Sequence, residues 1–144
     1  MRLVKLSTQE FEDLNKVNEY FQNVLPQRTP PGKFMIPKGW IAEDRLSEGE
    51  LVLFSFNSRV VRVAQAASGR RANDDPEFAD YPYYFLVDLD TLREVEFSVE
   101  DLERSMQNEC GVTKSIAVAH GWVLLPDTPA ATQVVERLSN QSAP

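Results

Sequence analysis

The sequence predicts a single α+β domain whose sheet of about five or six strands curves into a barrel and is flanked by three helices. The chain of 144 residues is 42% hydrophobic and 26% charged, as expected for one globular domain. Two apolar stretches rich in β-branched and aromatic residues, 51–56 and 60–67, predict a hairpin. Both faces of this hairpin are apolar, so we expect both to be covered.

The N-terminal part predicts a strand, a helix and a loop. Residues 1–6 form the strand, and Ser7 and Glu10 stand in the relation of a capping box at the start of a helix over 8–25. Pro26 ends that helix. Apolar residues at three- and four-residue intervals form the expected buried face of this helix: Phe11, Leu14, Val17, Phe21 and Val24. Residues 26–39 are rich in proline and glycine and predict a long loop, a kind of segment that often carries function.

The hairpin alternates, with Val52, Phe54 and Phe56 on one face and Leu51, Leu53 and Ser55 on the other. In its second strand Val61, Val63 and Gln65 oppose Val60, Arg62 and Ala64. The polar residues 68–82 predict a second long loop, and 83–89 and 93–97 predict two strands around a turn at Asp90 and Thr91.

The C-terminal part predicts two helices and one more strand. Ser98 caps a short helix that buries Val99, Leu102 and Met106 and ends at Gly111, and residues 115–125 form a strand. The last helix is capped by Asp127 or Thr128, has Pro129 at its first position, and buries the following stripe: Ala131, Val134, Val135 and Leu138. We expect one domain over 1–144, with 139–144 as a flexible tail.

The composition favours binding over catalysis. One cysteine, Cys110, and one histidine, His120, predict neither a zinc site nor a disulfide, and we expect no metal, no cofactor and no catalytic residue in this chain. Neither a phosphate-binding glycine loop nor a recognisable nucleophile is present. No apolar run has the length of a signal peptide or a membrane span, so the expected location is cytoplasmic.

The charge is unevenly distributed along the chain. The net charge of −7 argues against a polyanionic partner, but residues 28–71 carry eight basic and four acidic side chains and are therefore locally basic. Aromatic residues are concentrated in the same part of the chain and just after it. Rings beside arginines can stack a base while the arginines contact phosphates. A solvated arginine loop beside an ordinary aromatic core is the alternative interpretation.

Three segments, RLSEGELVLF at 45–54, RVVRVAQA at 59–66 and YYFLVDL at 83–89, resemble the PUA-like superfamily of small β-barrels, which includes the EVE, ASCH, YTH and SRA domains. The resemblance covers about a third of the chain. It is greatest to the N-terminal reader modules of modification-dependent restriction enzymes of the HNH type. It implies a barrel flanked by helices that recognises modified bases. The acidic composition and the single histidine depart from this pattern, and any nuclease activity would belong to another domain or partner.

The leading hypothesis is a module that binds nucleic acid, DNA with a modified base in the first place, or RNA. The residues predicted to contact the base and its surroundings are Trp40, Phe54, Phe56, Arg59, Arg62, Arg70, Arg71, Tyr81 and Tyr84. Lys33 and Lys38 are predicted to contact phosphates. A protein-interaction or regulatory module, whose acidic helices meet a basic partner, is the alternative. A small enzyme with an unrecognised site is a third possibility.

Overall fold

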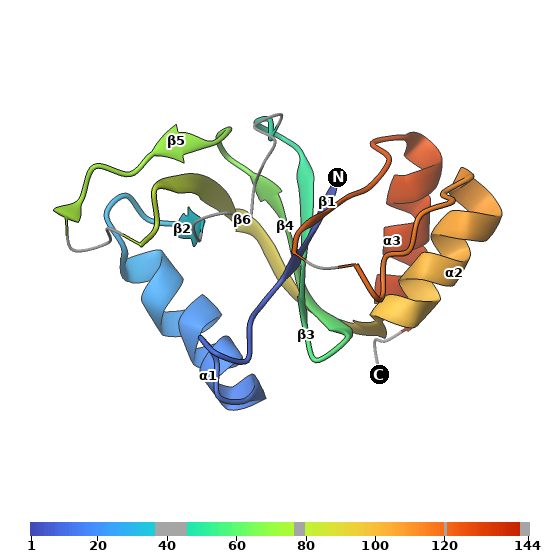
Figure 1. Cartoon of the computed structure of the whole chain (residues 1–144), viewed down its shortest axis with the longest axis horizontal. Coiled ribbons are helices and arrows are strands. Elements are labelled where there is room, and N and C mark those ends of the chain that lie inside the picture. Colours follow the sequence, from blue (N-terminus) through green and yellow to red (C-terminus); the bar gives the residue numbers. More distant parts are fainter. Residues whose placement is uncertain (37–45, 77–79, 120, 142–144) are drawn as a thin grey trace.

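The computed structural model describes residues 1–36, 46–76, 80–119 and 121–141. These residues form one curled sheet with α1 on one side and α2 and α3 on the other (Figure 1). The strands are β1 (Arg2–Lys5), β2 (Lys33–Ile36), β3 (Leu51–Phe56), β4 (Arg59–Ala66), β5 (Arg71–Ala72), β6 (Tyr83–Ser98) and β7 (Val123–Leu124). The helices are α1 (Leu14–Glu19), α2 (Val99–Cys110) and α3 (Pro129–Gln141). The predicted α+β class with a barrel-like sheet and three helices is confirmed.

The strand order is β2-β6-β4-β3-β1-β7, and β5 pairs with β6 outside this path. β1 runs parallel to β3, and the other pairs are antiparallel. The predicted hairpin of β3 and β4 is confirmed. Asn57 and Ser58 have φ angles of 49° and 63°, so they form a two-residue turn whose twist matches that of the strands.

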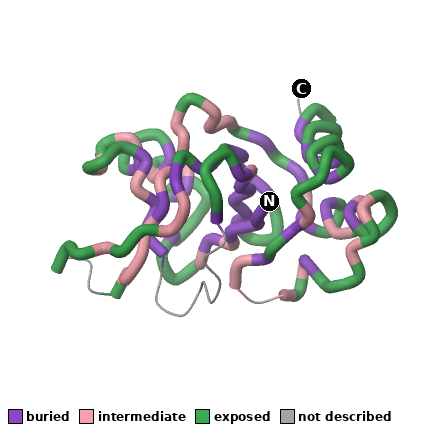
Figure 2. Tube along the Cα trace, turned by 90° about the horizontal axis from the view of Figure 1, so that it is seen from above, coloured by how far each residue is buried: buried purple, intermediate pink, exposed green. Residues whose placement is uncertain are grey.

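Two apolar cores lie on the two faces of the sheet. Val52, Phe54 and Phe56 belong to the core under α1, whereas Leu53 belongs to the core under α2 and α3, as their alternation predicts. In β4 the predicted alternation is wrong, because register shifts near Val60 and Val63 place these two residues on the same face. Figure 2 shows buried residues concentrated in the strands between the helices, whose outer sides are exposed.

The first helix differs from the prediction. It begins at Leu14, because Asp13 and not Ser7 is the cap, and its side chain accepts a hydrogen bond from the backbone of Lys16 at 3.0 Å. The chain continues as a π-helical turn (Tyr20–Val24) and a 3-10 turn (Leu25–Gln27). The later start leaves Leu14 47% exposed and Val24 40% exposed, so these two predictions of burial are wrong.

Three further predictions of secondary structure need correction. The two predicted loops contain the short strands β2 and β5, which pair with the start of β6. The turn predicted at Asp90 and Thr91 is a bulge within one strand of 16 residues, β6: Asp88 pairs with Gln65 and Arg93 with Val63, and the hydroxyl of Thr91 donates to the carbonyl of Asp88 at 2.7 Å. Only Val123–Leu124 of the strand predicted at 115–125 pairs with another strand.

The two C-terminal helices follow the predictions closely, except that α3 continues to Gln141, so 139–141 are helical although they were predicted to belong to the flexible tail. Ser98 caps α2 by accepting from the backbone of Asp101, and Gly111 ends the helix with a φ of 68°. Thr128 caps α3 by accepting from the backbone of Ala131 at 3.2 Å. The predicted buried stripes of both helices pack against the sheet.

Candidate nucleic-acid interface

The structure distributes the residues predicted to bind nucleic acid over several places. Lys33, Arg70, Arg71, Tyr81 and Tyr84 lie at the end of the sheet formed by β2, β5 and the start of β6. Phe56, Arg59 and Arg62 line a separate cavity under the hairpin. Phe54 lies in the core. Trp40 and Lys38 lie outside the described residues.

The first place is the paired edge of β2, β5 and β6, where a different cation covers each of two consecutive tyrosines, and we call it the tyrosine edge: Lys33, Arg70, Arg71, Tyr83 and Tyr84. As neighbours in β6, Tyr83 and Tyr84 point to opposite faces, and Tyr83 packs against the core under α1. Tyr84 of β6 pairs with Arg71 of β5 on one side and with β2 on the other. The ammonium of Lys33 lies 4.6 Å from the ring centroid of Tyr84, and the guanidinium of Arg70 lies 4.0 Å from that of Tyr83. Lys33 also donates to the side-chain oxygen of Asn73 at 3.2 Å. Cation–π contacts near the surface contribute only about 0.5–1 kcal/mol each, so they leave these cations able to contact a ligand as well.

Arg28 extends the positive charge behind the tyrosine edge. Its guanidinium donates to the carbonyl of Lys33 at 2.9 Å and to the hydroxyl of Tyr20 at 3.3 Å. Burial raises the pKa of Tyr20, and the charge of Arg28 opposes that shift. The arrangement fixes the start of β2, which carries Lys33.

A small pocket of about 190 Å³ adjoins the tyrosine edge, and we call it the Trp122 pocket. Phe34 and Met35 of β2 reach it from the strand that also carries Lys33. The rings of Phe34 and Trp122 lie 6.0 Å apart at 59°. The other lining residues come from the end of β1 and the segment after it: Val4, Lys5, Leu6, Ser7, Gln9 and Glu10. The pocket therefore combines aromatic rings with a polar wall.

The polar wall of the Trp122 pocket is organised around Glu10. Tyr81 donates its hydroxyl to the Glu10 carboxylate at 3.2 Å. Burial, followed by the nearby Glu10, raises the pKa of Tyr81, so its phenol stays protonated and keeps donating. Ser7 accepts from the backbone of Gln9 at 3.0 Å. A carboxylate at this position is an acceptor for N–H groups such as the exocyclic amines of bases.

A clamp of two charged side chains holds the segment that leads to Trp122. The ammonium of Lys5 donates to the carbonyls of Ile116, Ala117 and Ala119. The carboxylate of Glu103 on α2 accepts from the backbone of Ile116 at 2.6 Å and of Ala117 at 3.2 Å. Burial lowers the pKa of Lys5, and Glu103 opposes that shift. The segment keeps its shape without strand partners because these two side chains satisfy its backbone.

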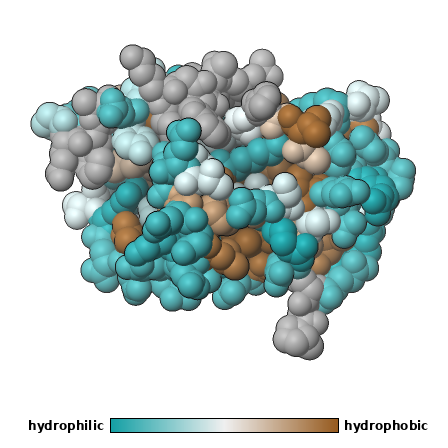
Figure 3. Space-filling model, turned by 60° about the horizontal axis from the view of Figure 1, so that its bottom comes forward, coloured by the Kyte–Doolittle hydropathy of each residue, from teal (hydrophilic) through white to brown (hydrophobic). Residues whose placement is uncertain are grey.

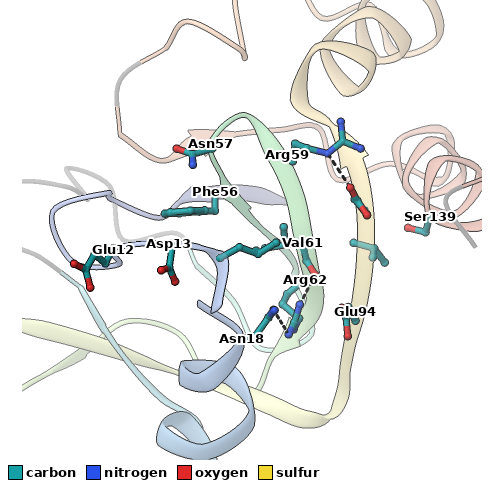
Figure 4. Close-up of a pocket in the computed structure, with 13 residues that line it drawn as sticks. Glu12, Asp13, Asn18, Phe56, Asn57, Arg59, Val61, Arg62, Glu94 and Ser139 are labelled. Carbon is teal, nitrogen blue, oxygen red and sulfur yellow. Dashed lines mark hydrogen bonds and ion pairs between the residues drawn. The ribbon is translucent and has the colours of Figure 1, made fainter. Parts of the chain in front are cut away.

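The second place is a cavity of about 600 Å³, which we call the Phe56 cavity. Arg62 is only 4% exposed there and donates to Asn18 and to the carbonyl of Val61, both at 2.9 Å (Figure 4). Burial lowers the pKa of Arg62, and the charge of Glu94 opposes that shift. Arg59 is paired with Glu96 at 3.3 Å. Both arginines of this cavity therefore already have partners within the protein.

Phe54 requires a correction. Its side chain is 0% exposed, and its ring packs against Phe21 and Phe34 at centroid distances of 5.1 and 5.2 Å. A base cannot stack on a ring that is enclosed on all sides, so Phe54 supports the wall of the pocket through Phe34. The alternation in β3 already placed Phe54 on a covered face.

Sequence reasoning missed Phe34, Glu10 and Trp122 as site residues. Phe34 stood in a segment predicted to be a loop, and Glu10 was interpreted as part of a helix cap. Trp122 stood in a predicted strand. The available signal for Trp122 was the residue type itself, because tryptophan is enriched at interfaces.

Metal binding and thiol chemistry have little support in the described parts of the chain. No group of three His, Cys, Asp or Glu side chains there is arranged to hold a metal ion. Cys110 is half-buried, and burial raises the pKa of its thiol, which disfavours the reactive thiolate. His120 lies outside the described residues. No described helix has the length and apolar character needed to cross a membrane.

The comparisons with known proteins show a likeness in fold and none in sequence. No family model matches the sequence, and no curated protein is significantly similar to it. The fold is similar to the YTH domain of the Zygosaccharomyces rouxii MRB1 protein, solved in complex with N6-methyladenosine RNA, with a TM-score of 0.52 and 16% identity. The likeness covers 94% of this chain and 83% of that one. The chain therefore has a fold similar to that of a YTH domain.

Proposed function

We propose that this protein is a reader of nucleic acid that takes one modified base into the Trp122 pocket. The observation that carries the proposal is the position of this pocket, which is aromatic on one side and polar on the other, directly beside the tyrosine edge. A base that leaves its stack needs a ring to lie against and partners for its hydrogen-bonding edge. Trp122 supplies the ring for the base, Phe34, which is 6% exposed, packs behind that ring, and Glu10 supplies an acceptor.

The tyrosine edge supplies the contacts to the backbone of the nucleic acid. Lys33, Arg70 and Arg71 bring three positive charges to one end of the sheet, while the chain as a whole is acidic. Local positive charge beside a recognition pocket positions a strand without reading its sequence. Tyr84 adds a ring face on which a neighbouring base can stack once Lys33 turns to a phosphate, whereas Tyr83 points to the opposite face of β6.

The size of the pocket favours a single flat ring system. A volume of about 190 Å³ is below that of usual pockets for drug-sized ligands, and it suits one base better than a nucleotide pair. A carboxylate in the wall favours a base that presents an N–H donor to it. The YTH domain with the similar fold was solved with RNA that carries N6-methyladenosine, which supports a modified base as the ligand here.

The finer form of the proposal is that this module gives specificity to a modification-dependent restriction system. The resemblance to reader modules of HNH-type enzymes supports it. A nuclease domain or partner chain would then supply cleavage, because this sequence contains one histidine and no His-Asn-His motif.

The test is fluorescence anisotropy with labelled oligonucleotides at low and moderate salt. The probes are single- and double-stranded DNA and single-stranded RNA, each unmodified or carrying N6-methyladenine, 5-methylcytosine or N4-methylcytosine. We expect tighter binding to one modified probe than to its unmodified counterpart. Equal affinity for all modified and unmodified probes, or no binding at low salt, would overturn the proposal.

Variants of the pocket distinguish base recognition from backbone contact. Trp122→Ala and Glu10→Gln should each remove most of the preference for the modified probe and leave binding to the unmodified probe nearly unchanged. Glu48→Gln, in the exposed turn before β3, is the matched control for Glu10→Gln, because it removes the same charge outside the pocket. The melting temperature of each variant shows whether the fold is intact.

A further inference from the structure

The Phe56 cavity differs from the tyrosine edge in its charge and therefore in the ligand it suits. Four carboxylates line it, Glu12, Asp13, Glu94 and Glu96, against the two arginines 59 and 62. The arginines are occupied, since Arg59 pairs with Glu96 and Arg62 donates to Asn18 and Val61. In the described parts of the chain, Glu12 and Glu94 form no ion pair. The accessible charge of the cavity is negative, and a phosphate backbone would be repelled there.

The floor of the Phe56 cavity is apolar. Phe56, Val61 and Val95 form it with exposed fractions of 4%, 5% and 8%, and Leu14 stands at its border with 47% exposed. Leu14 is one of four large apolar side chains that are strongly exposed among the described residues. From below, a band of apolar surface crosses the middle of the molecule between hydrophilic borders (Figure 3). An exposed apolar surface with a polar border is typical of a protein-binding site.

The two acidic borders come from different elements on opposite sides of the floor. Glu12 and Asp13 precede α1, while Glu94 and Glu96 lie on β6 (Figure 4). Asp13 also caps α1, so its position is fixed by the fold. A ligand on the floor would therefore have carboxylates on both sides.

We infer that the Phe56 cavity binds a short segment of a partner protein in which an aliphatic or aromatic side chain is flanked by lysine or arginine. The apolar side chain would lie against Phe56, Val61 and Leu14, and the flanking cations would pair with Glu94 on one side and Glu12 on the other. A cavity of about 600 Å³ has room for a few side chains of such a segment. The protein would then contact nucleic acid at one end of its sheet and a basic protein segment on another face.

The test uses the full chain and a fluorescein-labelled peptide in which leucine and phenylalanine alternate with lysine. Two control peptides replace every lysine by glutamate, or every apolar residue by serine. We expect the basic apolar peptide to bind, with an affinity that falls as salt is added, and both controls to bind at least about tenfold more weakly. No binding of the basic apolar peptide, or equal binding of the glutamate peptide, would overturn the inference.

Variants locate the peptide on the protein. The double variant Glu12→Gln and Glu94→Gln should weaken peptide binding roughly twofold to fivefold for each carboxylate removed. Glu48→Gln with Asp127→Asn, which removes the same charge around another hollow, should leave it unchanged. Leu14→Ser should weaken it as well, with little effect on the melting temperature because Leu14 is exposed. Equal effects of the two double variants would place the peptide elsewhere and overturn the inference.

A competition experiment separates this site from the proposed nucleic-acid interface. We expect the peptide and an oligonucleotide to bind at the same time, and Glu12→Gln with Glu94→Gln to leave the preference for a modified base unchanged. The lysines of the peptide can bind the oligonucleotide directly, so a titration of the peptide with the oligonucleotide alone is subtracted as a blank. Displacement of the peptide from wild-type protein beyond this blank would mean that nucleic acid occupies the Phe56 cavity, which would contradict the inference. Peptide binding without any oligonucleotide binding would overturn only the proposed reader function.

Discussion

Arg62 and Arg70 have the same side chain in very different surroundings. Arg62 is 4% exposed, with its guanidinium 5.3 Å from the ring centroid of Phe21 and hydrogen-bonded within the protein. Arg70 is half-buried and lies over Tyr83 at the edge of the sheet. Moving Arg62 to a ligand would leave Asn18 and the carbonyl of Val61 without their donor, which costs free energy. Arg70 is more exposed than Arg62 and is therefore the better candidate for a phosphate contact.

The first prediction concerns the salt dependence of binding. Replacing Arg70 and Arg71 together by glutamine should weaken binding to modified and unmodified oligonucleotides alike, because phosphate contacts carry no base specificity. The slope of log affinity against log salt should become shallower by about two for duplex DNA. Anisotropy titrations at several salt concentrations measure it. The double variant Arg104→Gln and Lys114→Gln, which removes the same charge elsewhere, should keep the wild-type slope.

The second prediction concerns the glycine before β2. Gly32 has a φ of +85°, and a Cβ atom there would lie 2.4 Å from the backbone oxygen of Val87. Gly49 has a φ of +87° but no atom within 4 Å of such a Cβ. Gly49→Ala should therefore cost only the conformational strain of about 1–2 kcal/mol, and Gly32→Ala should cost clearly more. Urea denaturation measures the free energy of unfolding of both variants. Equal losses of stability in the two variants would show that Gly32 does not pack tightly against β6.

At the scale of elements, local patterns predict some parts of this fold well and others poorly. The β3–β4 hairpin, α2 and α3 are set by their own residues: the polar Asn57 and Ser58 between apolar runs, and the caps at Ser98 and Thr128. β2 and β5 depend on pairing with β6, which is distant in sequence from β2, and their proline-rich and polar surroundings indicate loops. Short edge strands of this kind are specified by their partner more than by their own sequence.

The third prediction concerns the clamp on the segment before Trp122. Hydrogen bonds from the backbone lower the pKa of Glu103 below its ordinary value of 4.5. The bond from Ile116 has the largest effect, and the bond from Ala117 has the next largest. A carboxyl group with a lowered pKa in the folded state stabilises the fold above its unfolded pKa and loses this contribution as the pH falls through its folded pKa. The stabilisation should thus be present near neutral pH and disappear in the acid range.

Melting temperatures between neutral pH and about pH 3 test this prediction. Glu103→Gln should be less stable than wild type at neutral pH, and the difference should shrink as the pH falls. Glu100→Gln, on the same helix but not bonded to the segment, serves as the control. A difference between Glu103→Gln and wild type that stays constant with pH would show that the charge of Glu103 does not hold the segment.

At the scale of the whole molecule, one curled sheet separates two cores and presents two candidate sites. The composition and the apolar faces of the hairpin predict this architecture, because a sheet that is apolar on both sides must be covered on both. The Trp122 pocket could not be predicted in the same way. Its rings, Phe34 and Trp122, are far apart in sequence. They meet because β2, which carries Phe34, pairs with β6, and because Lys5 and Glu103 hold the segment that leads to Trp122.

The fold also separates the arginines that the sequence predicts to bind nucleic acid together. Arg59, Arg62, Arg70 and Arg71 form a single basic group in the sequence, but the fold sends the first pair to the Phe56 cavity and the second to the tyrosine edge. Counting charges along a chain cannot show which carboxylates will meet them. The acidic Glu94 and Glu96, which change the character of the Phe56 cavity, come from a strand that was predicted to be two.

The continuity of β6 has a mechanical consequence. Tyr83 and Tyr84 stand at its beginning, and Glu94 and Glu96 stand near its end, on one unbroken strand of 16 residues. Ten residues of strand span at most about 33 Å, and the bulge of β6 between Asp88, which pairs with Gln65, and Arg93, which pairs with Val63, bends the strand and shortens that span. A nucleic acid at one end and a partner segment at the other would be kept at a constant offset, so the strand would act as a spacer that sets how far from the recognised base the partner can reach.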